Sequence, residues 1–235
     1  METHRRRWII PALVIGMALA KATPLFTSAP QSAAKPILTA DEQSRVARAL
    51  ASGRIEMPAN IAILRGRTGA LPGADDPKPA FSPTAPVRTA VSEARPQFSW
   101  TPKAGSTRYS ITVFDERFRE VAKSGSLKTT TWTPRQDLPR GRVMAWQVTA
   151  INRDEKVMTP APPQPEARFV ILDSATVATL AKDRVRLARE PIALGLALAK
   201  AGLFAEADTV LQTALTDTRY DRSQVRALLA RVRAR

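Results

Sequence analysis

Apolar and polar residues alternate with a period of two in several short stretches in the middle of the chain. The alternation is clearest over residues 109–113, where Tyr109, Ile111 and Val113 are separated by polar residues, and over residues 144–150. Weaker stretches of the same kind cover residues 87–91, 98–100, 118–122, 129–133 and 168–172. Because side chains alternate between the two faces of a strand, the pattern predicts seven short strands.

Glycine, proline, serine, asparagine and aspartate separate these stretches at even spacing. Seven short strands with one apolar face each are expected to pack as two antiparallel sheets, a β-sandwich over residues 86–173. Trp100, Trp132 and Trp146, three of the four tryptophans, fall on three different predicted strands. Side chains of this size dominate the core of a small domain, so we expect the indoles to be buried.

The residues before this region follow a helical period. A helix is predicted over residues 39–53, because Thr39 and Glu42 have the spacing of a capping box and Gly53 supplies a C-terminal stop. Its apolar face consists of Val46, Ala49 and Leu50. A short apolar patch follows at residues 61–64, and we expect it to dock against another part of the protein.

Helical periodicity returns in the C-terminal part, residues 174–235. Four stretches have an apolar stripe at helical spacing, and they cover residues 174–189, 192–201, 204–215 and 223–232. Ser174 is expected to cap the first of them, and Pro191 suits the first turn of the second. The fold class predicted from these patterns is therefore multidomain, with a β-sandwich, a small helical module after it and one helix before it.

Three motifs lie within the predicted sandwich. They are P-x-F-x-W at residues 96–100, Y-x-I-x-V at residues 109–113, and L-P-R-G at residues 138–141 leading into W-x-V-x-A-x-N at residues 146–152. On these motifs, residues 86–173 resemble a divergent bacterial fibronectin type III domain. The family usually has a tyrosine six residues after the leucine, where this chain has Met144. The resemblance implies a structural or adhesive role and supplies no catalytic residues.

Small and apolar residues also recur at a familiar spacing within residues 191–217. They are Leu194, Gly195, Leu198, Gly202, Ala207, Leu211 and Ala214. On this spacing the segment resembles a single tetratricopeptide repeat, with Leu198 in place of the usual aromatic residue and without the terminal proline. The resemblance implies an antiparallel helical hairpin, which either docks on its neighbour or offers a groove to a partner.

The first residues have the pattern of an export signal. Arg5, Arg6 and Arg7 precede an uncharged apolar run over residues 8–20, and small residues follow it. We interpret residues 1–22 as a signal peptide, or as a membrane anchor if the segment is not cleaved. Residues 23–85 are expected to form a stalk and linker around the helix at 39–53. In both cases the remaining chain is expected outside the inner membrane, in the periplasm or another extracytoplasmic space.

Composition narrows the chemistry that the chain can perform. The sequence has no cysteine, and its single histidine, His4, lies in the predicted leader. We therefore expect no thiol or imidazole catalysis, no disulfide, no metal site and no cofactor, and we predict that the protein is not an enzyme. A carboxylate-based hydrolase was considered as an alternative, with the adjacent pairs Asp115–Glu116 and Asp154–Glu155 as its acids, but neighbours in sequence make poor pairs across a cleft.

The net charge of +15 is spread along the whole chain rather than concentrated in one segment. Nucleic-acid binding is therefore not predicted, because proteins that bind phosphate backbones gather their charge on one face. The predicted function is a non-enzymatic scaffold for protein–protein interaction in the bacterial envelope, with another envelope protein as partner. The alternatives are a module that binds cell-wall or other polysaccharide, and a membrane-anchored regulatory or assembly protein. The sequence does not identify individual binding residues.

Overall fold

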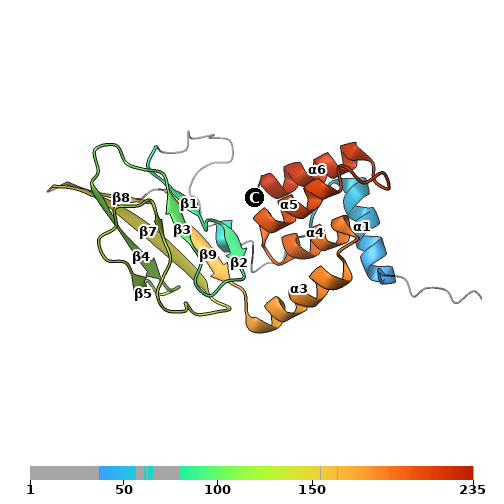
Figure 1. Cartoon of the computed structure of the whole chain (residues 1–235), viewed down its shortest axis with the longest axis horizontal. Coiled ribbons are helices and arrows are strands. Elements are labelled where there is room, and N and C mark those ends of the chain that lie inside the picture. The colour runs from blue at the N-terminus through green and yellow to red at the C-terminus, as the bar shows by residue number, and fades with distance from the viewer. Residues whose placement is uncertain are drawn as a thin grey trace, which may run out of the picture. The chain divides into compact units, whose positions relative to one another are not determined.

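The structure is a computed structural model, and it describes residues 37–56, 61, 63–65, 80–153, 155–162 and 164–234 (Figure 1). Within these ranges the chain forms nine β-strands, five α-helices and one short 3-10 helix. The predicted combination of a β region with helices before and after it is confirmed. The predicted leader, residues 1–22, and residues 23–36 of the predicted stalk lie outside the described residues.

The larger of two sheets has the strand order β2-β9-β7-β4-β5, and β8 pairs with the second half of β7. Its strands are β2 (Thr89–Val91), β4 (Arg108–Phe114), β5 (Glu120–Lys123), β7 (Val143–Asn152), β8 (Glu155–Thr159) and β9 (Ala167–Ile171). The central pair β4 and β7 is antiparallel, with Ile111 opposite Val148 and Val113 opposite Trp146. The apolar residues that alternate in the sequence therefore share one face of this sheet.

The smaller sheet contains three strands in the order β1-β3-β6. They are β1 (Pro83–Ala85), β3 (Phe98–Trp100) and β6 (Thr131–Trp132), and both pairings are antiparallel. The two sheets enclose one core. The ring of Phe98 in β3 lies 5.1 Å from Trp146 in β7 and 5.4 Å from Phe169 in β9, both with edge-on geometry.

The prediction for the tryptophans is confirmed for two of them. Trp100 and Trp146 are buried, and the indole Nε1 of Trp146 donates a hydrogen bond of 2.8 Å to the carbonyl oxygen of Pro86. Trp132 is half-buried, and its ring lies 5.4 Å from that of Phe98. Met144, six residues after Leu138, is a buried core residue.

All seven predicted strands are found, but the predicted number and the purely antiparallel arrangement are wrong. Two further strands, β1 and β8, raise the number to nine, and β2 runs parallel to β9. β1 lies among prolines that indicated a linker, and β8 begins with the charged residues Glu155 and Lys156 instead of an alternating pattern. Both lie at the margins of their sheets, where few apolar contacts are needed to hold a strand.

The predicted helices are present with small shifts at their ends. They are α1 (Ala40–Ser52), α3 (Ser174–Arg186), α4 (Pro191–Lys200), α5 (Phe204–Thr213) and α6 (Arg222–Arg233), with the 3-10 helix η1 at Ile63–Arg65. The capping box of Thr39 and Glu42 forms as predicted, and Gly53 ends α1 in the left-handed conformation. The residue that caps α3 is Asp173 and not Ser174, because the Asp173 carboxylate accepts a hydrogen bond from the Thr176 amide.

The helix α1 packs against α4 and α6, although the whole β region separates them in sequence (Figure 1). Ala49 of α1, with Ile55, Ile61 and Leu64 after it, belongs to the same apolar core as α3 to α6. Of the apolar patch at residues 61–64, Ile61 and Leu64 are buried in this shared core while Ile63 is exposed, and the 3-10 helix η1 that carries Leu64 lies against β9. Residues from before and after the β region together build one helical unit.

The helical unit is joined to the β region at Gly202. The carbonyl oxygen of Gly202 accepts hydrogen bonds of 2.9 Å from the amide of Ala90 and from the hydroxyl of Thr89, both in β2. A Cβ atom at Gly202 would lie 2.7 Å from Ile61, so only glycine permits this approach. None of the helices within the described ranges combines the length and apolar character that crossing a membrane requires.

Candidate binding cleft

A cleft of about 1030 Å³ lies among α1, α3, α4 and the C-terminal end of β9. Pockets that bind small molecules commonly have volumes of about 300–1,000 Å³, so the cleft is slightly larger than most of them. Its lining comes from parts of the chain that are far apart in sequence. The cleft therefore exists only because α1 docks on the C-terminal helices.

The floor of the cleft is one face of α4. Ala193, Ala197 and Ala201 line it at intervals of four residues, together with Leu196. An interval of four residues places side chains on the same face of a helix, one turn apart. Because alanine ends at Cβ, this face allows another backbone to come close. Leu196 and Ala197 are half-buried, so the floor is accessible from the open side.

The two walls are α1 and α3. Val46 and Ala49 contribute apolar surface from α1, while Thr176, Thr179 and Leu180 line the cleft from α3. Thr179 is exposed, and its hydroxyl donates a hydrogen bond to the carbonyl oxygen of Ala175 in the preceding turn. The hydroxyl donor therefore already has an acceptor within α3. The interior of the cleft is therefore mainly apolar, and its charged groups lie around the edge.

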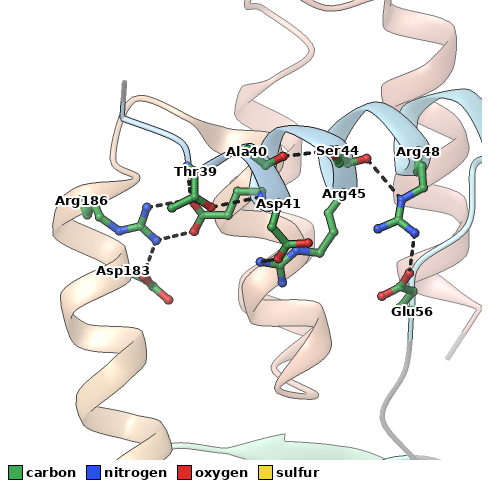
Figure 2. Close-up of polar contacts among 10 residues, drawn as sticks. Thr39, Ala40, Asp41, Ser44, Arg45, Arg48, Glu56, Asp183 and Arg186 are labelled. Carbon is green, nitrogen blue, oxygen red and sulfur yellow. Dashed lines mark hydrogen bonds and ion pairs between the residues drawn. The ribbon is translucent and has the colours of Figure 1, made fainter. Parts of the chain in front are cut away.

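Two arginines of α1, Arg45 and Arg48, line the cleft, and Figure 2 shows their polar contacts. Arg45 pairs with Asp41 at 2.8 Å, and Arg48 faces Glu56 at the longer distance of 3.7 Å. Arg48 also donates from Nε to the carbonyl oxygen of Ser44 at 3.4 Å. Asp41 and Glu56 are largely exposed, and ion pairs of this kind contribute about 0–1 kcal/mol to stability.

A stronger ion-pair network connects the two walls. Arg186 at the end of α3 donates from Nη2 to Glu42 at 2.6 Å and to Asp183 at 2.7 Å (Figure 2). Its Nη1 donates to the carbonyl oxygen of Ile37 at 3.2 Å. The hydrogen bond from Arg186 is the main cause that lowers the pKa of Glu42 to about 2. The same carboxylates raise the pKa of Arg186. This network fixes the first turn of α1 to the last turn of α3.

Equal numbers of cationic and carboxylate side chains line the cleft. Of its four lining carboxylates, Glu42 and Asp183 bind Arg186, Asp173 caps α3 and Glu56 faces Arg48. Hydrogen bonds from Thr176 lower the pKa of Asp173, so this carboxylate is held in its ionised form. Two lining cations, Arg54 and Lys200, have no carboxylate partner among the described residues. The four cations and four carboxylates that line the cleft therefore cancel in formal charge.

Asp115 and Glu116, the first acid pair of the hydrolase alternative, bind different parts of the backbone. Asp115 accepts hydrogen bonds from the amides of Arg117 and Arg119 and from the Arg119 side chain, and these bonds lower its pKa. Glu116 instead accepts from the amide of Val143 at 3.3 Å. Of the second pair, Asp154 lies outside the described residues and Glu155 is exposed at the start of β8.

Other signs of ligand chemistry are few in the described part of the chain. Its aspartate and glutamate side chains include no group of three that could hold a metal ion. Phe118, at the tip of the β4–β5 hairpin, is the one aromatic side chain there that is largely exposed, at 65 %. A row of exposed aromatic rings, which the polysaccharide alternative calls for, is therefore not present in these residues.

The cleft itself was not predicted from the sequence. The helices that form it were predicted. The sequence pattern indicates which face of a helix is apolar, but it does not indicate which other helix covers that face. The spacing of Ala193, Ala197 and Ala201 was the one available signal, and it also fits ordinary close packing between helices. A scan against protein-family models and a search of curated proteins both found no match for this chain.

Proposed function

We propose that this chain is an exported, non-enzymatic envelope protein that acts as a scaffold for protein–protein interaction, and that the cleft among α1, α3 and α4 is where it binds its partner. The observation that carries the proposal is the shape of the cleft, with two helical walls and a floor of small side chains. A groove of this form suits a helix or an extended segment of another protein, which would place its apolar side chains against α4.

The packing of the helical unit supports the resemblance to a tetratricopeptide repeat. The helices α4 and α5 form a tight hairpin, in which a Cβ atom at Gly195 would lie 2.6 Å from Leu211. Repeats of this family bind partners in the groove that their helices form, so we assign the same use to the α1, α3 and α4 groove. Here a helix from before the β region supplies one wall, which replaces a neighbouring repeat.

We also assign the β region to a divergent fibronectin type III-like sandwich. Support comes from the two sheets that share an aromatic core, and from Leu138, which is buried six residues before Met144. In this assignment the sandwich is a rigid spacer that carries the helical unit. The bonds from β2 to Gly202 hold the two regions together.

Export is the part of the proposal that rests on sequence alone. The basic and apolar pattern of residues 1–22 is that of a signal peptide or an anchor, so we place the remaining chain on the outer side of the inner membrane. A retained anchor would make the protein a membrane-bound assembly or regulatory factor with the same binding cleft. The polysaccharide alternative is less well supported, because the tryptophans Trp100 and Trp146 are buried in the core.

Site-specific photocrosslinking in the producing cell tests the proposal. A benzophenone side chain is introduced at Thr179, which is exposed and lines the cleft, or at Ala181, which is exposed on the same helix but does not line it. The expected result is a discrete adduct with one protein from position 179 that is missing from position 181. Equal adducts at both positions, or none at position 179, would argue against the cleft as the binding surface.

A further inference from the structure

We infer that α1 is a movable wall of the cleft, which swings away about Gly53 while α3 to α6 stay folded together. This inference rests on the proposed function and adds a way in which access to the cleft is regulated. Elements that open separately from the rest of a fold bury few apolar side chains and make few contacts with their neighbours. α1 has both properties.

The apolar attachment of α1 is small. Of its thirteen residues only Ala49 is buried, whereas six residues of α4 and four of α6 are buried. Val46 and Leu50, which share the face of Ala49, are half-buried. Alanine has the smallest apolar side chain, so its exposure costs less free energy than that of a buried leucine. Little hydrophobic stabilisation therefore opposes the release of α1 from α4 and α6.

The other wall, α3, also has one buried residue, but the chain is anchored at both of its ends. Its buried residue is Leu180, and Leu172 before the helix and Leu187 after it are buried in the same core. Before α1, in contrast, Ile37 is exposed and Leu38 is half-buried. Separate opening is therefore expected of α1 and not of α3.

The polar attachment of α1 runs through one residue of another helix. Within the described ranges, Arg186 of α3 makes the polar contacts that join α1 to the other helices, at 2.9 Å and 2.6 Å to the two carboxylate oxygens of Glu42. The ion pair of Arg45 with Asp41 lies inside α1 and moves with the helix. Release of α1 from α3 therefore breaks one charged contact, at its first turn.

Gly53 marks the point about which α1 turns. It has φ of 61° and ends the helix in the left-handed conformation, which glycine adopts without strain. A Cβ atom at Gly53 would lie 3.4 Å from Cβ of Ala227, and Ile55 is buried in the core of the helical unit, so the chain after the hinge stays attached. The pair of Arg48 with Glu56 crosses the hinge at 3.7 Å between exposed side chains, so it gives little resistance.

Opening of α1 removes one wall of the cleft. Val46 and Ala49 supply apolar lining from this wall, so the floor on α4 becomes accessible from that side when the helix leaves. A partner that fills the closed cleft contacts the wall and thereby stabilises the docked helix. Docking of α1 therefore retains a bound partner, and release of α1 lets the partner enter or leave.

Native-state hydrogen exchange of the full chain tests the inference, with mass spectrometry at urea concentrations below the unfolding transition. We expect the amides of α1 to exchange about tenfold faster than those of α4 and α6, or faster still. Exchange in α1 should depend little on urea, because local opening exposes little surface, whereas exchange in α4 and α6 should rise steeply. Equal rates with equal urea dependence would overturn the inference, since α1 would then open only when the whole unit unfolds.

Glu42→Gln tests the contact that holds α1 closed. At neutral pH we expect the α1 amides of this variant to exchange about tenfold faster than in the wild type, still with little dependence on urea. The matched control is Asp41→Asn, which removes a carboxylate that pairs with Arg45 inside α1, and it should change the rate by less than about threefold. An unchanged rate in Glu42→Gln, or the same acceleration in both variants, would overturn the gate as proposed.

These measurements use the chain without a partner, so they separate the inference from the function that it extends. If α1 does not open separately, the inference is overturned and the cleft remains a rigid groove, whose use the crosslinks at Thr179 still test. Absence of an adduct at position 179 would instead overturn the proposed function and, with it, the role of α1 as a gate.

Discussion

Arg186 donates a hydrogen bond of 2.6 Å to Glu42, a residue 144 positions earlier in the chain. The pair joins the first turn of α1 to the last turn of α3, so it closes the helical unit across the inserted β region. The carboxylate of Glu42 also accepts from the amide of Thr39 and thereby completes the cap of α1. One side chain therefore supports both the start of a helix and its attachment to another helix.

This pair makes stability depend on pH in a defined range. The pKa of Glu42 is lowered from 4.5 to about 2, mainly by the hydrogen bond from Arg186. Because the pKa is lower in the folded state, ionised Glu42 stabilises the protein at pH values above its ordinary pKa of 4.5. This contribution to stability is lost as the pH falls from about 4.5 to about 2. We expect Glu42→Gln to lower the free energy of unfolding by about 1–2 kcal/mol at neutral pH. This is less than the pKa shift of Glu42 alone would give, because the Arg186 side chain is partly exposed and solvent screens the pair.

Urea unfolding of the wild type and Glu42→Gln at several pH values measures this effect. The two proteins should differ at pH 7 and become equally stable toward pH 2. Glu93→Gln is a suitable control, because Glu93 is exposed and its removal should have little effect. A difference between the wild type and Glu42→Gln that does not change with pH would show that the ion pair is not the cause.

The close packing of α4 on α5 predicts a strong effect at Gly195. A Cβ atom at this position would lie 2.6 Å from Cγ and Cδ2 of Leu211, which is buried. Gly195→Ala is therefore expected to destabilise the protein by about 1–3 kcal/mol through overpacking, even though alanine favours helices. Thermal and urea unfolding measure the loss.

Two comparisons show whether overpacking is the cause at Gly195. Adding Leu211→Ala to Gly195→Ala should cost less than Leu211→Ala costs in the wild type, because the methyl group then has space. Gly125→Ala is the control, since nothing lies within 4 Å of its added Cβ. Independent, additive effects of the two substitutions would contradict the contact.

The backbone conformation of the hairpin between β4 and β5 predicts a difference in stability between two substitutions at Phe118. Phe118 has φ of 57°, in the left-handed region, and its side chain is mostly exposed. An L-residue with a side chain costs about 1–2 kcal/mol in this conformation, whereas glycine adopts it freely. We expect Phe118→Gly to be more stable than Phe118→Ala by about 1 kcal/mol, because both lack the ring and only glycine removes the strain. Greater stability of the alanine variant would contradict this reason.

The sequence predicted most of the local structure. The strands β4 and β7 were predicted because alternation over several residues leaves one face apolar, and the helix α1 because Thr39, Glu42 and Gly53 mark its two ends. β1 and β8 were missed since strands at a sheet margin need little apolar surface and leave a weak pattern. The predicted cap of α3, Ser174, lies one residue after the actual cap, Asp173, and residues of both types cap helices well.

The assembly of the cleft lay beyond these patterns. The apolar face of α1 is small, with Ala49 as its one buried residue, so it indicates that the helix packs but not where. The pairing of Glu42 with Arg186 likewise has no local signature, because both residues are also ordinary parts of a helix surface. Interactions between segments separated by a whole domain depend on how that domain brings the chain ends together.

The attachment of α1 to the C-terminal helices is therefore the relation on which the cleft and its proposed use depend, and a disulfide tests it directly. A Cβ atom at Gly53 would lie 3.4 Å from Cβ of Ala227 in α6, close to the usual separation of about 3.5–4.5 Å in a disulfide. The chain has no cysteine of its own, so Gly53→Cys with Ala227→Cys would form one defined bond. Gly53→Cys with Gly125→Cys is the control, because no atom lies within 4 Å of an added Cβ at Gly125.

Oxidation of the folded chain, followed by non-reducing electrophoresis and peptide mapping, gives the measurement. We predict rapid and nearly complete formation of the 53–227 bond within one chain, no bond in the 53–125 control, and a higher urea midpoint for the oxidised than for the reduced 53–227 variant. Failure of the folded protein to form the 53–227 bond, or its formation only between two chains, would contradict the packing of α1 on the C-terminal helices.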